Sequence, residues 1–186
     1  MAKKNEKKEK NAPVQLFDKF GEFNSVEELN KAAAGQLAEG DTEALKALAK
    51  ENGIDDEAVS DYMNGYTKEL AVPMLAALGR INVERDTWTG LEARVKGPCM
   101  AIAAMAESMI IDEGFARKVM QKGKRIKQIA TLMYREHCIM GTDQELEDII
   151  SAYYQNGEEG AKGAIAVIRG ITERYNGQGA TLNDGI

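Results

Sequence analysis

The sequence predicts an all-α protein, a compact multi-helix bundle with a disordered basic N-terminal tail. Apolar residues recur at spacings of three and four along most of the chain, and the alternation typical of a half-buried strand is almost absent. Helix-capping residues stand directly before several of these apolar stripes. The chain has 186 residues, of which 44% are hydrophobic. A chain of this size can bury a core without a metal or a disulfide, and its composition excludes disorder throughout.

The first two expected helices begin at capping residues. Ser25, followed three residues later by Glu28, forms a capping box that opens a helix, and Gly40 closes this helix. Asp41 or Thr42 caps the second helix.

A third helix is expected after the Asn-Gly turn that ends at Gly53. Asp55 begins it, and its apolar stripe continues through Tyr66 to Leu70. Pro73 must kink or end this helix, because proline lacks the N–H group that the helical hydrogen bonds require.

Residues 79–98 show no sustained period and contain three glycines, Pro98 and the single tryptophan, Trp88. They are the best candidate for a boundary between two halves of the chain. The expected organisation is a disordered tail at 1–13, an N-terminal helical subdomain at 14–78, a linker at 79–98, a C-terminal helical subdomain at 99–176 and a flexible tail at 177–186.

The second half is expected to hold further helices separated by glycines. Residues 100–111 are apolar nearly all round, as in the middle of a bundle, and residues 115–121 form a short helix. A longer helix follows, with apolar residues from Ile126 to Met140 on one face and His137 on that stripe. Thr142 and Glu145 form a second capping box, and the last helix carries the stripe at 161–175.

Few residues could support catalysis. His137 is the single histidine, and we expect it to be a core or interface residue rather than a ligand. Cys99 and Cys138 match no common zinc spacing and are expected to be free buried thiols. The glycines of the GEEGAKG segment at 157–163 follow no strand, so a turn and a close-packed helix start are favoured over a phosphate loop. We therefore expect no enzyme, cofactor or metal, and a site built from carboxylates alone is the enzymatic alternative.

The sequence contains no recognisable signal peptide and no apolar run long enough to span a membrane. With two cysteines and no disulfide framework, the protein is expected in the cytoplasm, without a membrane partner or a small-molecule substrate.

Basic residues gather between positions 117 and 127, where no acidic residue occurs. Several of them can be presented together to a row of phosphates. A solvated helix face, or contact with acidic residues of the same chain, is the alternative interpretation. The candidate nucleic-acid or partner-binding residues are Arg117, Lys118, Lys122, Lys124, Arg125, Lys127 and Arg135.

Acidic residues dominate the segment at 141–159, which contains no basic residue. Acids at helix starts account for about half of this excess. The remainder leaves a negative face that can meet a basic protein. The candidate partner-facing acids are Asp143, Glu145, Glu147, Asp148, Glu158 and Glu159.

Two segments carry a resemblance to a known group of proteins. They are GIDDEAVSDYMNGYTKELAVPMLAALGRINVE at 53–84 and GFARKVMQKGKRIKQIATLMYREHCIMGTDQELEDIISAYYQNG at 114–157. They resemble small proteins from phages and mobile elements of gut Firmicutes, among which are anti-CRISPR inhibitors of Cas9.

The resemblance implies a non-enzymatic inhibitor that acts in the cytoplasm of a bacterial host. Such a protein binds guide-loaded Cas9 and blocks target DNA engagement or cleavage, with duplex DNA as a further contact. The alternative is a DNA-binding accessory or regulatory protein of a mobile element, which uses the basic helix from Lys124 in a helix-turn-helix-like pairing.

Overall fold

The computed structural model describes residues 16–138 and 142–180, and these residues contain eight helices and no strand. The predicted all-α fold is confirmed for this part of the chain, and the expected tail at 1–13 lies outside it. The helices are α1 (Val26–Ala38), α2 (Thr42–Glu51), α3 (Asp56–Met63), α4 (Pro73–Asp86), α5 (Ala93–Met109), α6 (Glu113–Val119), α7 (Ile126–Arg135) and α8 (Asp143–Ala180).

The predicted helix starts are confirmed by their side-chain hydrogen bonds. Ser25 accepts a hydrogen bond from the backbone N–H of Glu28 at 3.3 Å, and the Glu28 carboxylate accepts one from Asn24 at 2.8 Å. Thr142 and Glu145 accept from each other's backbone N–H groups, both at 3.2 Å. These bonds satisfy N–H groups that a helix start otherwise leaves unpaired.

The third helix is shorter than the sequence predicts. α3 ends at Met63, Gly65 then takes a left-handed conformation with φ of 75°, and Tyr66 is 80% exposed. Pro73 begins α4 instead of ending α3. The first position of a helix suits proline, because no intrahelical hydrogen bond is needed there and its φ is already helical.

The residues expected to form a linker, 79–98, are mostly helical. Residues up to Asp86 belong to α4, those from Ala93 belong to α5, and Pro98 lies inside α5. Trp88, between the two helices, is buried. The apolar period fails here because α4 buries the charged residues Arg80 and Glu84, so its inner face does not appear as a hydrophobic stripe.

The helix after Ile126 also ends earlier than expected. α7 stops at Arg135, and His137 takes a left-handed φ of 49° and is exposed, so it is not a core residue. Met140, the expected end of this stripe, lies outside the described residues.

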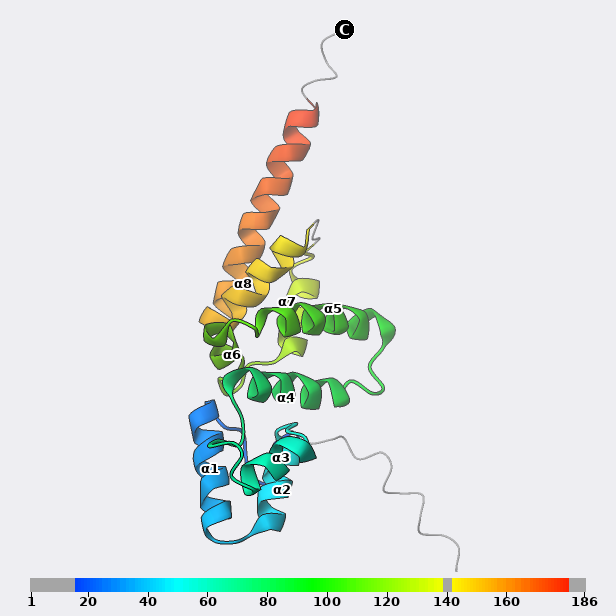
Figure 1. The fold of residues 1–186 in the computed structure, drawn as a ribbon. Helices are drawn as coiled ribbons and strands as arrows, with labels where there is room; N and C mark the ends of the chain where they lie inside the picture. The colour runs from blue at the N-terminus through cyan, green and yellow to red at the C-terminus, as the bar shows by residue number, and fades with distance from the viewer. Residues whose placement is uncertain (1–15, 139–141, 181–186) are drawn as a thin grey trace, which may run out of the picture.

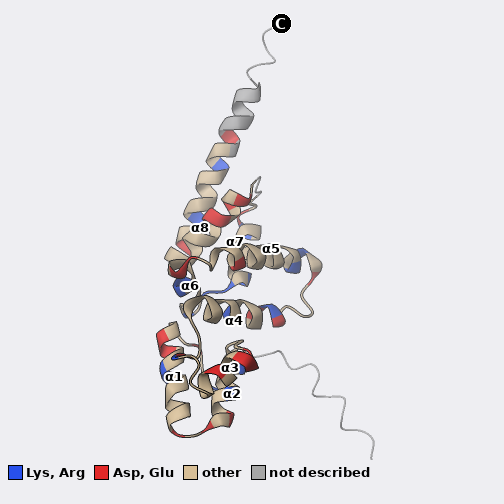
Figure 2. Ribbon diagram, in the orientation of Figure 1, with Lys and Arg blue, Asp and Glu red and all other residues tan. Residues whose placement is uncertain are grey.

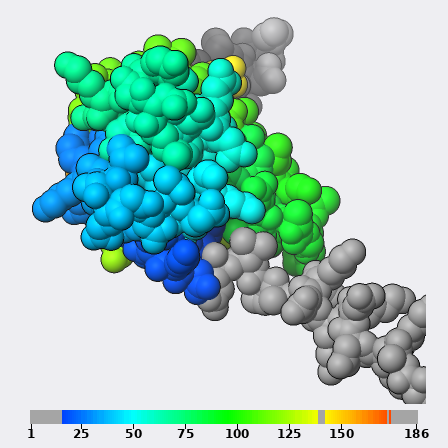
Figure 3. Space-filling model, turned by 60° about the horizontal axis from the view of Figure 1, so that its bottom comes forward, coloured from blue at the N-terminus to red at the C-terminus, as the bar shows by residue number. Residues whose placement is uncertain are grey.

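The buried apolar residues form two clusters. One cluster lies among α1–α3 and the start of α4, and it takes in Met120 from the end of α6. The other extends from Ala77 in α4 to Ile168 in α8. Seen from the side of α1–α3, these three helices cover one broad face of the molecule (Figure 3).

α8 consists of two arms that meet at Gly157, where φ is 69° and ψ is −153° (Figure 1). A Cβ atom on Gly160 would lie 2.4 Å from the carbonyl oxygen of Ala152. The predicted turn and close-packed helix start in the GEEGAKG segment are thus confirmed. The second arm continues to Ala180, past residue 177, where a flexible tail was expected to begin.

Among the described helices, none is both long enough and apolar enough to cross a membrane.

Candidate functional site

The predicted basic segment lies on the α6–α7 unit, which consists of α6, the turn at 120–125 and α7. Gly123 in the turn has φ of 80°, a left-handed conformation that glycine adopts without a Cβ clash. Lys and Arg positions, blue in the ribbon of Figure 2, recur on α6 and on the turn below α5.

Two buried charged residues of α4, one helical turn apart, hold both ends of this turn. The Arg80 guanidinium donates to the carbonyl oxygens of Met120 at 2.5 Å and Gln121 at 3.2 Å, and so caps the end of α6. The Glu84 carboxylate accepts from the backbone N–H groups of Ile126 and Lys127, both at 3.0 Å. Glu84 therefore acts as the N-terminal cap of α7, which has no local side-chain cap.

Glu22 completes this network from the segment before α1. Its carboxylate accepts from the backbone N–H of Gly123 at 3.0 Å and from the Arg125 guanidinium at 2.7 and 2.8 Å. It also lies 3.3 Å from the Arg80 guanidinium. The N-terminal segment, α4 and the turn are thereby joined through buried and half-buried charges.

Burial shifts the pKa values of these groups. Burial lowers the pKa of Arg80 to about 10, although the charge of Glu22 opposes this shift. Burial raises the pKa of Glu84, against the opposing effect of its hydrogen bonds from Lys127 and Ile126. For Glu22, burial raises the pKa, but the hydrogen bonds from Arg125 and Gly123 outweigh it and leave the pKa below its ordinary value.

Four of the predicted basic residues contact groups of the same chain. Arg117 pairs with Glu27 and Glu113, and Arg135 pairs with Glu158. The Lys124 ammonium donates to the backbone oxygen of Tyr153 at 3.1 Å and lies over its ring, while Arg125 is held by Glu22.

The other three, Lys118, Lys122 and Lys127, form no ion pair with any residue of 16–138 or 142–173. Within the basic segment, these three lysines are therefore the cations available to an external partner.

The predicted acidic residues do not form one uniform surface. Glu145 belongs to the capping box of α8, and Asp148 accepts from the Gln144 amide at 3.0 Å. Glu158 and Glu159 both pair with Lys162, at 3.2 and 2.7 Å. Asp143 is exposed and Glu147 is half-buried. The structure thus neutralises part of the negative charge around Gly157 and leaves the start of α8 acidic.

The outer face of α7 is polar and exposed. Its exposed residues are Lys127, Gln128, Thr131, Tyr134 and Arg135. The opposite face is buried in the larger apolar cluster. Lys124, expected at the start of this helix, lies instead in the turn before it.

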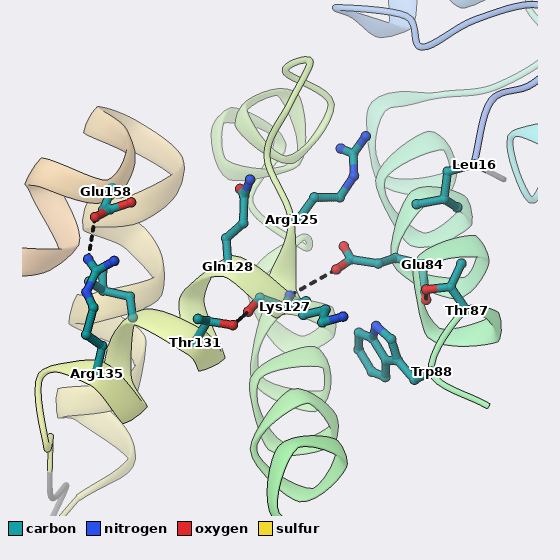
Figure 4. Close-up of a pocket in the computed structure, with 11 residues that line it drawn as sticks. Leu16, Glu84, Thr87, Trp88, Arg125, Lys127, Gln128, Thr131, Arg135 and Glu158 are labelled. Atoms are coloured by element: carbon teal, nitrogen blue, oxygen red, sulfur yellow. Dashed lines mark hydrogen bonds and ion pairs between the residues drawn. The ribbon is translucent and has the colours of Figure 1, made fainter. Parts of the chain in front are cut away.

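A groove of about 420 Å³ lies between the end of α4 and this face of α7 (Figure 4). Its lining includes Glu84, Trp88, Lys127, Gln128 and Arg135. Arg80, Glu84 and this groove had no role in the predictions from the sequence. One signal could have indicated the two residues, since Arg80 and Glu84 stand four residues apart in a stretch that is otherwise apolar except for Asn82.

No cluster of His, Cys, Asp and Glu in the described part of the chain could hold a metal ion. Cys99 and Cys138 are free thiols, as predicted, although Cys138 is only half-buried. Burial raises the pKa of both thiols, which makes them less reactive than an exposed cysteine.

Comparisons of the chain with protein-family models, with curated proteins and with solved structures found no match.

Proposed function

We propose that this protein is a non-enzymatic inhibitor that binds a guide-loaded Cas9 effector in the cytoplasm of a bacterial host. Binding would block target DNA engagement or cleavage. The partner is suggested by the resemblance of residues 53–84 and 114–157 described above. The structural support is a separation of charge between two parts of the molecule.

The first part is the acidic lobe, defined as residues 16–72 with helices α1–α3. It contains 13 acidic and 5 basic residues, and its acids are spread over the helix ends (Figure 2). Cas9 holds the guide–target heteroduplex in a positively charged channel. An acidic lobe is electrostatically complementary to such a channel, and this complementarity favours fast encounter and partner selection.

The second part is the α6–α7 unit with its three unpaired lysines. It can contact the DNA that the effector engages, because Lys118, Lys122 and Lys127 have no acidic partner in the described chain. In this arrangement, the acidic lobe would meet the protein and the basic unit would meet nucleic acid.

The test is DNA cleavage by guide-loaded Cas9 with the protein in excess, together with co-elution in size-exclusion chromatography. Asp56→Asn with Glu57→Gln removes two exposed charges of the acidic lobe, and Asp143→Asn with Asp148→Asn removes two at the start of α8. The α3 pair is expected to weaken inhibition, whereas the exposed control Asp86→Asn should leave it unchanged. A stronger effect of the α8 pair would move the contact to that surface.

Unchanged cleavage across several Cas9 orthologues would contradict the proposal.

A DNA-binding accessory or regulatory protein of a mobile element is the second candidate. The observation that favours it is the exposed polar face of α7 directly after the basic turn, because DNA-binding proteins of the helix-turn-helix type place such a helix in the major groove. Exposed Lys127, Gln128 and Arg135 on α7 are of the residue types that contact phosphates and base edges.

Salt-dependent binding to duplex DNA tests this second candidate. Replacing Lys118, Lys122 and Lys127 with Gln should lower the slope of log affinity against log salt by about 2 to 3, since each lost phosphate contact removes about 0.9. The matched control replaces three lysines of the acidic lobe, Lys31, Lys50 and Lys68, and should keep the slope. Equal slopes for the two triple variants would exclude the α6–α7 unit as the DNA contact.

A further inference from the structure

The floor of the groove between α4 and α7 contains a buried hydrogen-bond donor without an acceptor. Trp88 is 1% exposed, and its indole Nε1 has no hydrogen-bond partner among the described residues. Figure 4 shows the nitrogen edge of the ring turned toward the space beside Lys127 and Glu84. A buried N–H without an acceptor is unfavourable, so its position next to a groove points to an acceptor on a ligand.

Lys127 supplies a second donor to the groove. It has no ion pair within the described chain. The Gln128 side-chain oxygen accepts from the Tyr153 hydroxyl, and Figure 4 shows the Gln128 side chain extended away from Trp88 and Lys127. Two side chains, Trp88 and Lys127, thus offer N–H donors to one space.

The acidic groups of the groove are already occupied. Both oxygens of Glu84 accept backbone N–H groups of α7. Glu158 pairs with Arg135 and Lys162, and Arg125 is neutralised by Glu22. Among the basic residues that line the groove, Lys127 is the one without an acidic partner in the described chain.

We propose that this groove binds a phosphate group, with Trp88 and Lys127 as its donors. A phosphate carries several strong acceptor oxygens and a negative charge, and therefore matches this set of donors. The volume of about 420 Å³ also leaves room for the group attached to the phosphate, against the apolar side chains of Leu16 and Leu132.

The phosphate can come from a free nucleotide or from the backbone of a nucleic acid that lies along α7. Only the second source rests on the nucleic-acid contact proposed above. The two sources can be distinguished because Trp88 is the single tryptophan of the chain. Its indole N–H therefore gives one peak in a ¹H–¹⁵N NMR spectrum, and this peak reports directly on the groove.

The experiment titrates the full chain with inorganic phosphate, with AMP and with a short DNA duplex, and uses acetate at equal ionic strength as the control. We expect a saturable downfield shift of the indole proton with at least one phosphate compound and no such shift with acetate. Lys127→Gln should weaken this binding about tenfold, which is typical for loss of a charged hydrogen bond. The matched variant Lys31→Gln, at an exposed lysine of the acidic lobe, should bind as the natural chain does.

No saturable shift with any of the three phosphate compounds, or an equal shift with acetate, would overturn the proposal. A shift with AMP combined with unchanged Cas9 cleavage would keep the phosphate groove and reject the inhibitor function. Inhibition of cleavage without an indole shift would keep the inhibitor function and reject the phosphate groove.

Discussion

Replacing Arg80 with Met removes the group that joins α4 to the end of α6 and to the segment before α1. Methionine keeps much of the apolar volume of the side chain but donates no hydrogen bond. The carbonyl oxygens of Met120 and Phe23, now 2.5 and 2.7 Å from the guanidinium, would lose their donor. The Glu22 carboxylate, 3.3 Å away, would lose one of its two cations.

The expected cost follows from burial on both sides of this contact. The side chains of Arg80 and Glu22 are only 5% and 10% exposed. Breaking a buried ion pair by removing one partner typically costs about 3 to 5 kcal/mol. For a chain of this length, such a loss corresponds to a fall in the melting temperature of roughly 6 to 20 °C.

Thermal unfolding and urea unfolding, both followed by circular dichroism, measure this loss. Arg94→Met is the matched control, because Arg94 pairs with Glu92 at 2.6 Å while both side chains are about 70% exposed. An exposed pair contributes less than about 1 kcal/mol. Equal losses in the two variants would refute the reasoning that the buried network of Arg80 stabilises the fold.

Three further predictions concern the glycine contacts, a titrating carboxylate and the thiols. Gly79→Ala should lower the free energy of unfolding by about 2 to 3 kcal/mol, because the new Cβ would lie 2.3 Å from a backbone oxygen of the α2–α3 turn. Gly35→Ala, in open space in α1, should raise the free energy of unfolding by up to about 1 kcal/mol. Urea unfolding measures both changes, and two changes of the same sign would contradict the packing argument. The pKa of Glu22 is lowered in the folded state, so its contribution to stability is present above the ordinary carboxyl pKa and lost as pH falls through the folded value. Thermal unfolding should therefore show the full destabilisation by Glu22→Gln at about pH 7 and a smaller destabilisation below about pH 4.5. An equal destabilisation at both pH values would contradict this prediction. Reductant and chelator should leave the melting temperature unchanged, because Cys99 and Cys138 are free thiols; a fall of many degrees would show a bond or a metal that supports the fold.

The sequence by itself determined the features that depend on neighbouring residues. The capping boxes at Ser25 and Thr142 occur where their motifs predict them, because the capping side chain and the N–H groups it satisfies lie within one turn. The turn at Gly157 was predictable for the same reason, since its left-handed conformation is readily adopted by glycine. The buried apolar face of α7 followed from the helical period.

The tertiary structure alone decided how the basic segment is used. Arg80 and Glu84 contact groups about forty residues away, and Glu22 contacts groups about a hundred residues away. No local sequence pattern indicates such distant contacts. Because α4 buries the charged residues Arg80 and Glu84, its segment lacks an apolar period, and the sequence did not indicate this helix. The same long-range contacts occupy Arg125 and Arg135 and leave Lys127 without a partner beside Trp88. The composition gives the number of charges. Only the packing of α4 against α6 and α7 decides which of these charges are neutralised within the chain and which can bind a partner.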